Sequence, residues 1–599
     1  MATNITIQTL LPDLIKYKQV PNKEGNIFEK TFIGIDFGTS TTVVSIATID
    51  KNTRAIKAEP IWIKQKLSDG AIVTSEKIPS AIALYNNSIL VGQGAADLKY
   101  KLEKGKNVWF SFKMELGADL GPIYYNTQLD KNTPYPIYTP KDAAKVFFQY
   151  LKSQIDKYVA EKNLPQNLEF AVSIPASFEA NQRKDLVEAL EQSGMKISNQ
   201  SLIDEPNAAF LNFIQVSENE LNPLILPEND NTKILVFDFG AGTCDISILE
   251  IGQDIKGIYS KNLAISKFER LGGDDIDWLI AYRYLLVSLL QENGKKESEF
   301  RTSEKKRIIT HLLKTAEQLK IMICENIALQ MTNRILPANA WSKNKVSINV
   351  PIEIDTRKGL LVLEESSLSY EEFHEVMKVF LNIDSSKPYR IESMDREFVS
   401  IFNPIQSALK KASLSKKDID YVLLIGGSSK NPYVQFALKE YFKDSELLVP
   451  RDLQTHVSAG AAIHCLAYNG FNKNIIQPIT SEPLLVITKD EKPKVILKAG
   501  TQIPCDLIVI DDLVTSQDNQ KAVELPICVG NTNKLLHNIK IVSNSTEGFR
   551  KNTPVKLEIE ITTDKLLHVR ASVEGKDAIV QPFNPFANKE LTTEQRNIL

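Results

Sequence analysis

Cysteine and histidine are scarce in this chain of 599 residues, and neither occurs in a metal-binding or disulfide pattern. The five cysteines are scattered and never in Cys-x-x-Cys spacing, and the six histidines include no His-Glu-x-x-His motif. Zinc sites and disulfide frameworks require such groupings. We therefore expect no zinc site, no disulfide framework and a reducing compartment.

Long apolar segments are also missing. No uninterrupted apolar run approaches the roughly 18–20 residues that a membrane-spanning helix needs. The N-terminal segment lacks a basic stretch followed by an apolar one, and Pro12 interrupts its single apolar patch. The formal net charge of −3 disfavours nucleic acid or an anionic membrane as the main partner. The sequence thus predicts a soluble, cytoplasmic protein that binds neither.

The length exceeds what one hydrophobic core supports, so we expect two to four domains. Residues 1–30 form a polar extension, and between 31 and 470 short Val/Ile-rich runs alternate with helical patterns, which is typical of layered α/β structure. Residues 471–482 have the polar composition of a linker. Residues 483–585 show the alternation of an all-β module, and 586–599 begin a helix with a capping box at Thr592 and Gln595.

Apolar spacing also predicts individual elements. In the α/β part it indicates helices over 141–160 and 304–326 and strands over 168–174 and 420–427. In the β module it indicates strands over 484–488, 494–497, 523–528, 539–542, 555–562 and 566–572.

Two segments of the α/β part have nearly the same sequence: 31–47 reads TFIGIDFGTSTTVVSIA and 233–250 reads KILVFDFGAGTCDISILE. Each contains a strand that ends in Asp-Phe-Gly, a turn of small residues and a second strand. Asp36 and Asp238 are 202 positions apart, which indicates a duplicated lobe. The small turn residues leave backbone N–H groups free to bind an anion, and each aspartate can reach a metal ion or its waters. Facing each other, the two hairpins would bind the phosphates of a nucleotide from both sides.

A third segment, LIGGSSKNP at 424–432, is a strand that ends in Gly-Gly-Ser before an expected helix. Its glycines let a flat ligand lie close to the backbone, which fits an adenosine contact. Each segment alone is also explained as an ordinary strand and turn. The pair of hairpins with matching flanks, at domain-scale separation, favours the nucleotide site.

The order of these motifs is similar to that of the actin/hexokinase/heat-shock ATPase superfamily, and within it to the 70-kDa heat-shock chaperones of the DnaK type. The similar segments are AVSIPASFEANQRKDLVEAL (171–190), SLIDEPNAAF (201–210), RLGGDDID (270–277), KTAEQLK (314–320), IPCD (503–506), QDNQKAVEL (517–525) and LLHVRAS (566–572). The resemblance covers about 31–599. It implies an α/β, two-lobed, actin-like (duplicated ribonuclease H-like) ATPase domain followed by an all-β sandwich that binds peptides.

The resemblance implies that Asp36 and Asp238 hold hydrated Mg2+, with Glu205 acting through water. It assigns catalytic roles to Lys113, Thr243, Glu205 and Asp238. Lys113 would orient water and stabilise charge on the γ-phosphate, and Thr243 would lie near the attacking water. This suits phosphoryl transfer, in which positioning and charge stabilisation do most of the catalysis. Outside the resemblance, Lys113 is one solvated lysine among many.

Further roles follow from the same resemblance. Pro175 and Arg183 match the family's proline switch and its partner, and Val523 and Leu525 match residues of the peptide pocket, although a core valine in a sandwich strand explains Val523 nearly as well. The implied cofactors are ATP or ADP, Mg2+ and K+, and the implied partners are unfolded or apolar peptide segments with J-domain and nucleotide-exchange co-chaperones. The implied nucleotide-binding residues are Gly38, Thr39, Ser40, Gly240, Ala241, Gly242, Gly272, Gly273, Glu317, Lys320, Ile321, Cys324, Gly426, Gly427, Ser428 and Lys430.

Several features differ from the family pattern. Ala241 stands where the family usually has Gly, which is tolerable only if its φ is negative. The apolar residues of the linker are reduced to Ile475 and Ile476, and the loop 488–494 is polar. The sequence ends where a helical lid would begin, so we expect faster peptide exchange than in a lidded chaperone.

Three functional classes are compatible with these motifs. The first is an ATP-dependent chaperone in which hydrolysis is coupled to peptide affinity. The second is a nucleotide-gated scaffold of low turnover that binds one dedicated protein partner, which the polar loop 488–494 and the reduced linker favour. A sugar kinase of the same superfamily is disfavoured, because it needs a catalytic aspartate facing the sugar and would not carry a β-sandwich. We predict the first.

We predict weak ADP binding, because Ile321 and Lys430 stand where many members of the resembled family place two arginines around the adenine. An Ile side chain and a Lys stem can pack on a base, but neither provides the planar stacking of a guanidinium group. Titration calorimetry with ADP measures the affinity, and a dissociation constant in the nanomolar range would contradict the prediction.

Overall fold

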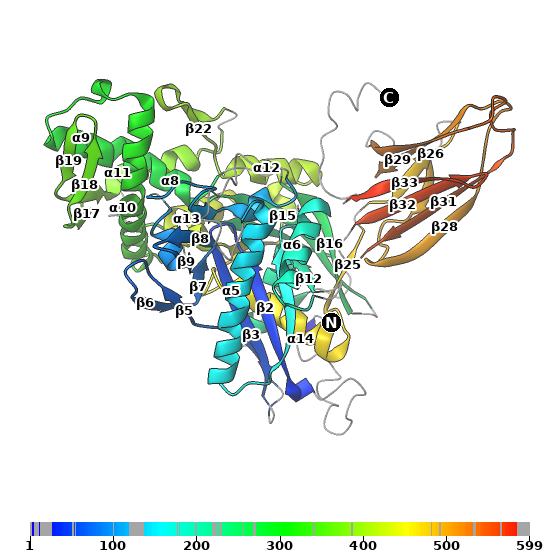
Figure 1. Cartoon of the computed structure of the whole chain (residues 1–599), viewed down its shortest axis with the longest axis horizontal. Helices are drawn as coiled ribbons and strands as arrows, with labels where there is room; N and C mark the ends of the chain where they lie inside the picture. Colours follow the sequence, from blue (N-terminus) through cyan, green and yellow to red (C-terminus); the bar gives the residue numbers. More distant parts are fainter. Residues whose placement is uncertain are drawn as a thin grey trace.

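The computed structural model contains a mixed α/β part and, at its C-terminal end, an all-β part that lies to one side of it (Figure 1). The structure describes residues 3–4, 11, 27–50, 53, 55–99, 101–118, 137–176, 178, 180–197, 201–217, 225–226, 231–254, 257–266, 271–332, 334–337, 340, 342–384, 387–480, 482–489, 493–530, 535–562 and 566–583. The predicted helix start at Thr592 lies outside these residues.

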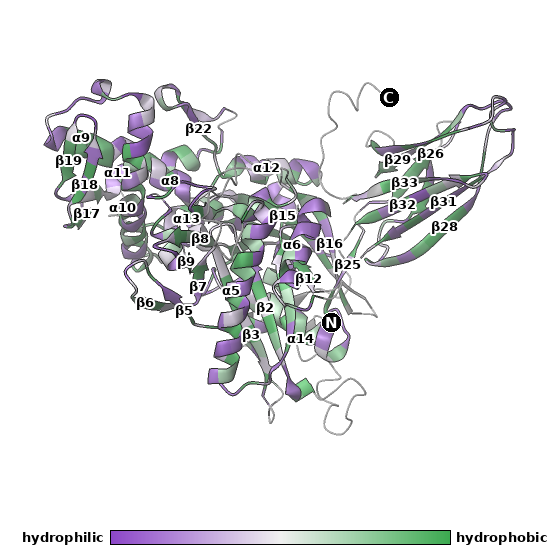
Figure 2. Ribbon diagram, in the orientation of Figure 1, coloured by the Kyte–Doolittle hydropathy of each residue, from purple (hydrophilic) through white to green (hydrophobic). Residues whose placement is uncertain are grey.

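The first Asp-Phe-Gly hairpin belongs to a six-stranded sheet. Its spatial order is β12 (Leu202–Asp204), β11 (Asn167–Ile174), β2 (Lys30–Phe37), β3 (Thr41–Ile49) and β4 (Ile56–Pro60), with β7 (Lys77–Pro79) beside β3. β2, β3 and β4 are antiparallel neighbours, whereas β11 and β12 extend the other edge in parallel. β2 and β3 are largely hydrophobic (Figure 2) and mostly buried, as expected of strands that are covered on both faces.

A second six-stranded sheet has the same arrangement around the second hairpin. Its spatial order is β24 (Glu446–Leu448), β23 (Tyr421–Ile425), β14 (Thr232–Phe239), β15 (Cys244–Asp254), β16 (Gly257–Ile265) and β25 (Ile476–Ile479). β14, β15 and β16 are antiparallel, and β23 and β24 are parallel to β14. The two sheets share the order and directions of five strands and differ in the sixth, which is β7 beside β3 in the first sheet and β25 beside β16 in the second. The shared five strands agree with the duplication that the spacing of Asp36 and Asp238 predicts.

Two helices, α7 (Glu205–Ser217) and α14 (His456–Phe471), share one hydrophobic core with strands of both sheets. α14 approaches its neighbours very closely. A Cβ atom on Gly34 of β2 would lie 2.1 Å from the backbone N of Ala462, and one on Gly460 would lie 1.8 Å from the carbonyl O of Ala208. Only glycine at these two positions lets α14 pack directly against β2 and α7.

Other helices pack against the remaining faces. α5 (Pro140–Glu161) and α6 (Ala180–Gln192) pack with the first sheet, and the long α10 (Thr302–Ala328) belongs to the core of the second. The helices predicted over 141–160 and 304–326 are thus confirmed. A capping box sets the start of α5, because Asp142 accepts from the N–H of Thr139 while Thr139 Oγ1 accepts from the N–H of Asp142. At the start of α10, Glu304 accepts from the N–H of Arg301.

The remaining elements of the α/β part are short. The helices are α3 (Gln93–Ala96), α8 (Gly273–Ile280), α9 (Leu286–Glu292), α11 (Tyr370–Phe380), α12 (Phe402–Lys411) and α13 (Pro432–Tyr441). The small sheets pair β5 (Ile63–Lys66) with β6 (Ile72–Ser75), β8 (Ala81–Tyr85) with β9 (Ser88–Val91) and β10 (Val108–Phe110), and β1 (Thr3–Asn4) with β13 (Ile225–Leu226). They also pair β17 (Lys345–Ile348) with β20 (Ser366–Ser369), β18 (Ile352–Thr356) with β19 (Gly359–Leu363), and β21 (Tyr389–Ile391) with β22 (Arg396–Phe398).

The C-terminal part consists of two four-stranded antiparallel sheets around one core. One sheet has the order β27 (Pro493–Leu497), β26 (Leu484–Ile487), β29 (Ala522–Val529) and β30 (Leu535–Val542), and the other β28 (Cys505–Val514), β31 (Pro554–Ile561), β32 (Leu567–Val573) and β33 (Lys576–Phe583). The six predicted strands of this module are confirmed. β28 and β33 were not predicted, because both are edge strands in which charged residues, two bulges or Pro582 interrupt the alternation.

The predicted linker contains a strand of the second sheet. β25 pairs in parallel with β16, so that Ile476 lies opposite Ile258, and Ile475 and Ile476 are buried in the core around α14. On its other side, Gln477 Nε2 donates to the carbonyl O of Ile503 at 2.6 Å, and Ile479 forms a bridge with Gln502. The segment therefore connects the α/β part with a loop of the β module.

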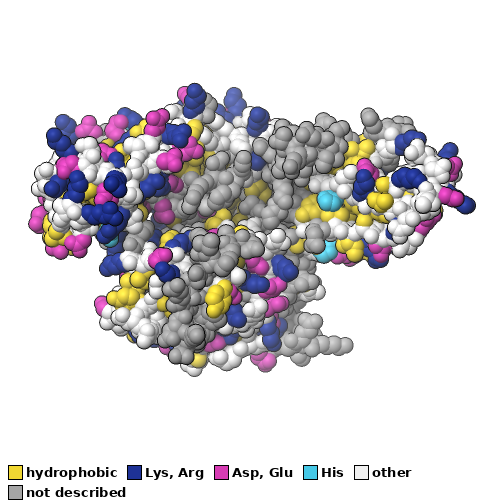
Figure 3. All heavy atoms as spheres, turned by 45° about the horizontal axis from the view of Figure 1, so that its top comes forward, with side chains coloured by type: hydrophobic (Ala, Val, Ile, Leu, Met, Phe, Trp, Pro, Cys, Tyr) yellow, Lys and Arg dark blue, Asp and Glu magenta, His cyan; other side chains and the backbone are white. Residues whose placement is uncertain are grey.

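The surface of the described residues carries charges of both signs. Figure 3 shows Lys and Arg side chains interspersed with Asp and Glu over one face of the molecule. All five cysteines carry free thiols. Within the described part of the chain, no helix is both long and apolar enough to cross a membrane.

We predict that Gly460→Ala destabilises the α/β part by about 3 kcal/mol or more, because the new methyl group would overlap the backbone of α7 and force α14 away from it. Denaturant unfolding followed by tryptophan fluorescence measures this, since all four tryptophans lie before residue 470. Gly242→Ala is the matched control, because a Cβ there meets no atom within 4 Å. Equal unfolding midpoints for the two variants would contradict the prediction.

Candidate functional site

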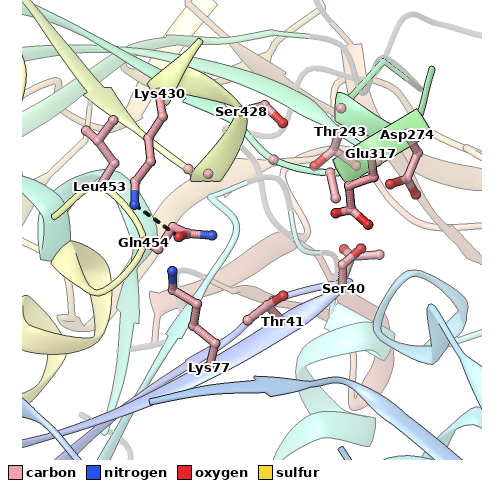
Figure 4. A pocket seen from close by; sticks show the side chains of 18 of the residues that line it. Ser40, Thr41, Lys77, Thr243, Asp274, Glu317, Ser428, Lys430, Leu453 and Gln454 are labelled. Carbon is pink, nitrogen blue, oxygen red and sulfur yellow. Dashed lines mark hydrogen bonds between the residues drawn. The ribbon is translucent and has the colours of Figure 1, made fainter. Parts of the chain in front are cut away.

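The turns of the two Asp-Phe-Gly hairpins face one cavity of about 1840 Å³. Figure 4 shows Ser40 and Thr41 on one wall, and Thr243, Asp274 and Glu317 on the opposite wall. The turn residues that line the cavity are Gly38, Thr39, Ser40, Gly240, Ala241, Gly242 and Thr243. The structure thus brings together two turns that are far apart in the sequence.

Hydrogen bonds fix the shape of both turns. Ser80 donates from Oγ to the carbonyl O of Gly38 at 2.7 Å and from its N–H to that of Ser40 at 2.9 Å. In the second turn, the N–H of Gly240 donates to the carbonyl O of Thr243 at 2.9 Å. Gly242 lines the cavity, and a Cβ there would meet open space. Glycine at this position keeps that space free for a ligand.

Four carboxylates of the cavity lie near a single lysine. Asp36 and Asp238 are near the ends of β2 and β14, Asp245 lies opposite Asp238 in β15, and Glu205 begins α7. Lys113, from a short 3-10 helix, donates to Glu205 Oε1 at 2.8 Å, and both side chains are almost fully buried. The cluster therefore contains more negative than positive groups.

Burial and mutual repulsion raise the pKa of these carboxyl groups. Burial, followed by the charge of Glu205, raises the pKa of Asp36 to about 7 and that of Asp245 to about 6. The same two causes raise the pKa of Asp238 well above its ordinary value. Burial alone would lower the pKa of Lys113, but Glu205 and Asp36 outweigh it and the pKa is raised. Such a site binds protons or a cation readily.

The donor set fits hydrated Mg2+. Carboxylate oxygens are the ligands that Mg2+ prefers, and the ion usually keeps several waters. Among the residues that the structure describes, no group of three His, Cys, Asp or Glu side chains is placed to ligate a metal directly. Asp36, Asp238 and Glu205 are the residues that would hold the ion, through its waters.

Comparisons with known proteins address the identity of the chain. The family model described as Hsp70 protein matches residues 32–353 and 367–595, which is more than half of the chain. The chain belongs to the Hsp70 family. A relative, the Chaperone protein dnaK of Cyanidium caldarium, is 27% identical over 563 residues, which cover 91% of this chain and 78% of that protein. The resemblance drawn from the sequence is confirmed, and Hsp70 proteins are ATP-binding chaperones.

The end of the cavity to which the sequence assigned the nucleoside is formed by α8, α10 and the Gly-Gly-Ser segment. Lys320 Nζ donates to Asp277 Oδ2 at 2.8 Å and to the carbonyl O of Gly273 at 3.2 Å. Gly426 has φ 82°, and a Cβ there would lie 2.6 Å from Asp238 Oδ1, so only glycine fits. The predicted residues at this end that line the cavity are Gly273, Glu317, Lys320, Ile321, Cys324, Gly426, Gly427, Ser428 and Lys430.

Gly272 is the exception among the predicted nucleotide-binding residues, because it does not line the cavity. It lies against the second turn instead, where a Cβ would be 2.0 Å from the carbonyl O of Ala241. Its role in this Hsp70 is therefore close packing beneath the turn.

The residues that differ from the family pattern have distinct surroundings. Ala241 is not among the described non-glycine residues with positive φ, so its methyl group causes no backbone strain. Ile321 is 43% exposed at the cavity wall. Lys430 donates to Gln454 Oε1 at 3.2 Å (Figure 4).

Cys324 is a predicted nucleotide-binding residue that also lines the cavity. Burial raises the pKa of its thiol to about 12.

Pro175 and Arg183 are connected through one residue. Pro175 follows β11 and lines the cavity, and its carbonyl O accepts from the N–H of Phe178 at 3.0 Å. Arg183 on α6 donates from Nε to the carbonyl O of Phe178 at 3.1 Å. The Lys113 ammonium lies 5.7 Å from the centre of the Phe178 ring. Phe178 therefore contacts both the predicted switch residues and the predicted catalytic lysine.

Val523 and Leu525 lie on β29, and both side chains are 6% exposed or less. They belong to the core between the two C-terminal sheets. The structure places them away from the cavity of the α/β part, in the module to which the sequence assigned peptide binding.

Sequence reasoning missed several residues of the site. Asp245 could have been found, because counting from the turn of the second hairpin places it opposite Asp238. Asp277 ends the RLGGDDID segment (270–277), so that motif could have pointed to it. Ser80, Gln454 and Arg396 come from segments without a recognisable motif, and only the fold brings them to the cavity or its turns.

We predict that Asp36→Asn stabilises the nucleotide-free protein above neutral pH and weakens binding of the Mg2+–nucleotide complex. The pKa of Asp36 is about 7 in the folded chain against an ordinary value of 3.8, so the folded chain holds a proton that the unfolded chain releases between these values. Stability therefore falls as the pH rises through this window. Asn keeps an acceptor for the Ser173 hydroxyl, which donates to Asp36 Oδ1 at 2.9 Å.

Thermal unfolding between about pH 5 and pH 8 checks the sign, since one proton bound only in the folded chain changes the slope by about 1.4 kcal/mol per pH unit. The variant should show a smaller slope than the natural chain. Asp444→Asn, at an exposed position, is the control and should leave the slope unchanged. Identical slopes for all three proteins would rule the prediction out.

Proposed function

We propose that this Hsp70 is an ATP-dependent molecular chaperone that binds unfolded or apolar peptide segments, with ATP hydrolysis coupled to peptide affinity. The supporting observation is that two hairpins, from sheets that share the order of five strands, face one cavity that contains the Lys113–Glu205 pair. In this proposal, residues 31–470 form a two-lobed, actin-like ATPase domain of duplicated ribonuclease H-like lobes. Residues 483–585 form the peptide-binding sandwich, 471–482 the linker and 586–599 the start of a lid helix.

The turns would bind the phosphates. Backbone N–H groups of both turns and the hydroxyl groups of Thr39, Ser40 and Thr243 all lie at the cavity. Bound Mg2+ would supply the positive charge that neutralises the phosphate oxygens. The nucleoside would lie between the N-terminal end of α8 and the Gly426–Gly427 backbone, where Ile321 and Cys324 offer an apolar wall.

Hydrolysis needs a positioned water and a place for its proton. Lys113 is held by Glu205, so its ammonium would orient the water and stabilise charge on the γ-phosphate. Thr243 would hold the water near the phosphorus atom. Asp238, whose pKa is raised by burial and by Glu205, would accept the proton that the attacking water releases.

Coupling would use two routes out of the site. The hydrogen bonds of Phe178 with Pro175 and Arg183 connect the cavity to α6. β25 connects the second sheet to the loop of the β module. Closure of the two lobes on ATP would change both, and thereby the affinity of the sandwich for peptide. We place this activity in the cytoplasm, with J-domain and nucleotide-exchange co-chaperones as partners.

Single-turnover ATP hydrolysis, measured with and without an apolar peptide, tests the proposal. We predict stimulation by the peptide and a loss of about a hundredfold or more in rate for Lys113→Ala and Thr243→Ala. Lys106→Ala is the matched control, because this lysine lies on the surface in an ion pair with Glu103. Nucleotide binding without turnover in the natural chain would favour the nucleotide-gated scaffold, and no nucleotide binding would refute both.

A further inference from the structure

The β21–β22 hairpin places an arginine at the wall of the cavity. Arg396 is the first residue of β22, lines the cavity, and is about one-third exposed. Its guanidinium carbon lies 4.5 Å from the centre of the Trp278 ring and 5.4 Å from that of Phe398. Cation–π contact with two buried aromatic rings restricts the position of the guanidinium group.

The guanidinium group in turn holds one carboxylate. Arg396 Nη2 donates to Asp275 Oδ1 at 2.7 Å, while Asp275 Oδ2 accepts from the N–H of Gly272 at 3.0 Å. Asp275 therefore uses one oxygen for the hairpin and the other for the first residues of α8. The contact joins segments that are 121 positions apart in the sequence.

The start of α8 then contacts the second phosphate turn directly. The N–H of Gly273 donates to the carbonyl O of Gly240 at 3.1 Å, and that of Asp274 donates to the carbonyl O of Ala241 at 2.8 Å. Gly272 packs so closely on Ala241 that no side chain fits there. The position of this turn thus depends on the position of residues 272–274.

We propose that Arg396 is a positioning residue for the nucleotide: through Asp275 and the start of α8, it fixes the turn Gly240–Thr243 in the geometry that binds phosphate. The inference rests on the proposed function, because it assigns the turn to phosphate binding. Arg396 itself contacts no turn residue by any hydrogen bond that the described structure contains, so its effect passes through Asp275.

Electrostatics support this pathway. Burial raises the pKa of Asp275, and the charge of the neighbouring Asp274 adds to this, whereas the hydrogen bond and charge of Arg396 oppose the rise. Without Arg396, Asp275 would bind a proton more readily and would accept the Gly272 N–H less strongly. Loss of the arginine should therefore matter most below neutral pH.

The test measures ADP and ATP affinity by titration calorimetry, and single-turnover hydrolysis, for Arg396→Met. We predict nucleotide affinity weaker by about tenfold, as expected for loss of a charge-assisted hydrogen bond, with a smaller change in the rate at saturating ATP. The loss should grow as the pH is lowered from neutral. Arg396→Lys keeps the charge without the planar guanidinium group and should recover part of the affinity.

Two further variants separate positioning from general stability. Arg390→Met is the matched control on the same hairpin, because Arg390 is 60% exposed and pairs only weakly with Asp395, at 3.5 Å. It should leave affinity unchanged. Asp275→Asn should weaken binding by itself, and adding Arg396→Met to it should cause little further loss, since both changes break one pathway.

The outcomes separate a failure of the proposed nucleotide binding from a failure of the positioning role of Arg396. If the natural chain binds neither ADP nor ATP, the proposed function fails. If it binds them and Arg396→Met binds equally well, the inference is overturned. Additive effects of Arg396→Met and Asp275→Asn would also overturn it, because they would show that the arginine acts without Asp275.

Discussion

Lys113 and Glu205 form a buried ion pair at 2.8 Å, and the carboxylates of Asp36, Asp238 and Asp245 lie near this pair in the cavity. Burying charged groups is unfavourable unless each is paired, and one lysine cannot pair four carboxylates. The raised pKa values of Asp36 and Asp245 are the consequence of this imbalance. The site is therefore under electrostatic strain that protons or a hydrated cation relieve. In the proposed function, a Mg2+–nucleotide complex would relieve this strain on binding, so affinity would be gained at the cost of stability without ligand.

The duplicated sheets are what make this arrangement possible. Asp36 and Asp238 occupy equivalent positions in two sheets that share the order of five strands, so the fold needs only to bring two equivalent strand ends together. α7 and α14 share a core with both sheets, and the glycines Gly34 and Gly460 allow backbone-to-backbone packing in that core. Close packing without voids transmits small displacements well. A shift of α14 would therefore displace β2, against which it packs at Gly34.

The sequence predicts the features that neighbouring residues determine, and it does not predict those that depend on contacts between segments far apart in the chain. The hairpins, α5, α10 and the β-rich module follow from local patterns and turn chemistry, and the structure confirms these elements. Gly242 and Asp245 are also local to a hairpin. Ser80 and Arg396 are not, because their roles arise from contacts with Gly38 and Asp275 that no local pattern contains.

The linker contains a strand that its local sequence does not predict. Residues 471–482 have the composition of a flexible connection, yet Ile476–Ile479 form an edge strand beside β16. The linker's apolar pair, Ile475 and Ile476, is too short to show the alternation of apolar and polar residues that predicts a strand. Pairing to an existing sheet edge supplies the order instead, through backbone hydrogen bonds. Pro478, which lies opposite Ser260, has no N–H to donate, and its carbonyl O accepts from the N–H of Ile503 in the β module.

Burial of Ile475 and Ile476 limits how strongly nucleotide could control the β module. Ile475 and Ile476 are 3% and 8% exposed, and releasing each of them to water costs about 2 kcal/mol. A ligand shifts a conformational equilibrium only by the difference between its affinities for the two states. If the proposed cycle releases β25 from β16, nucleotide must therefore favour one state by roughly the same amount, about 4 kcal/mol, unless new contacts of the β module compensate. The loop around Ile503, which Gln477 already contacts, is where such compensation would arise.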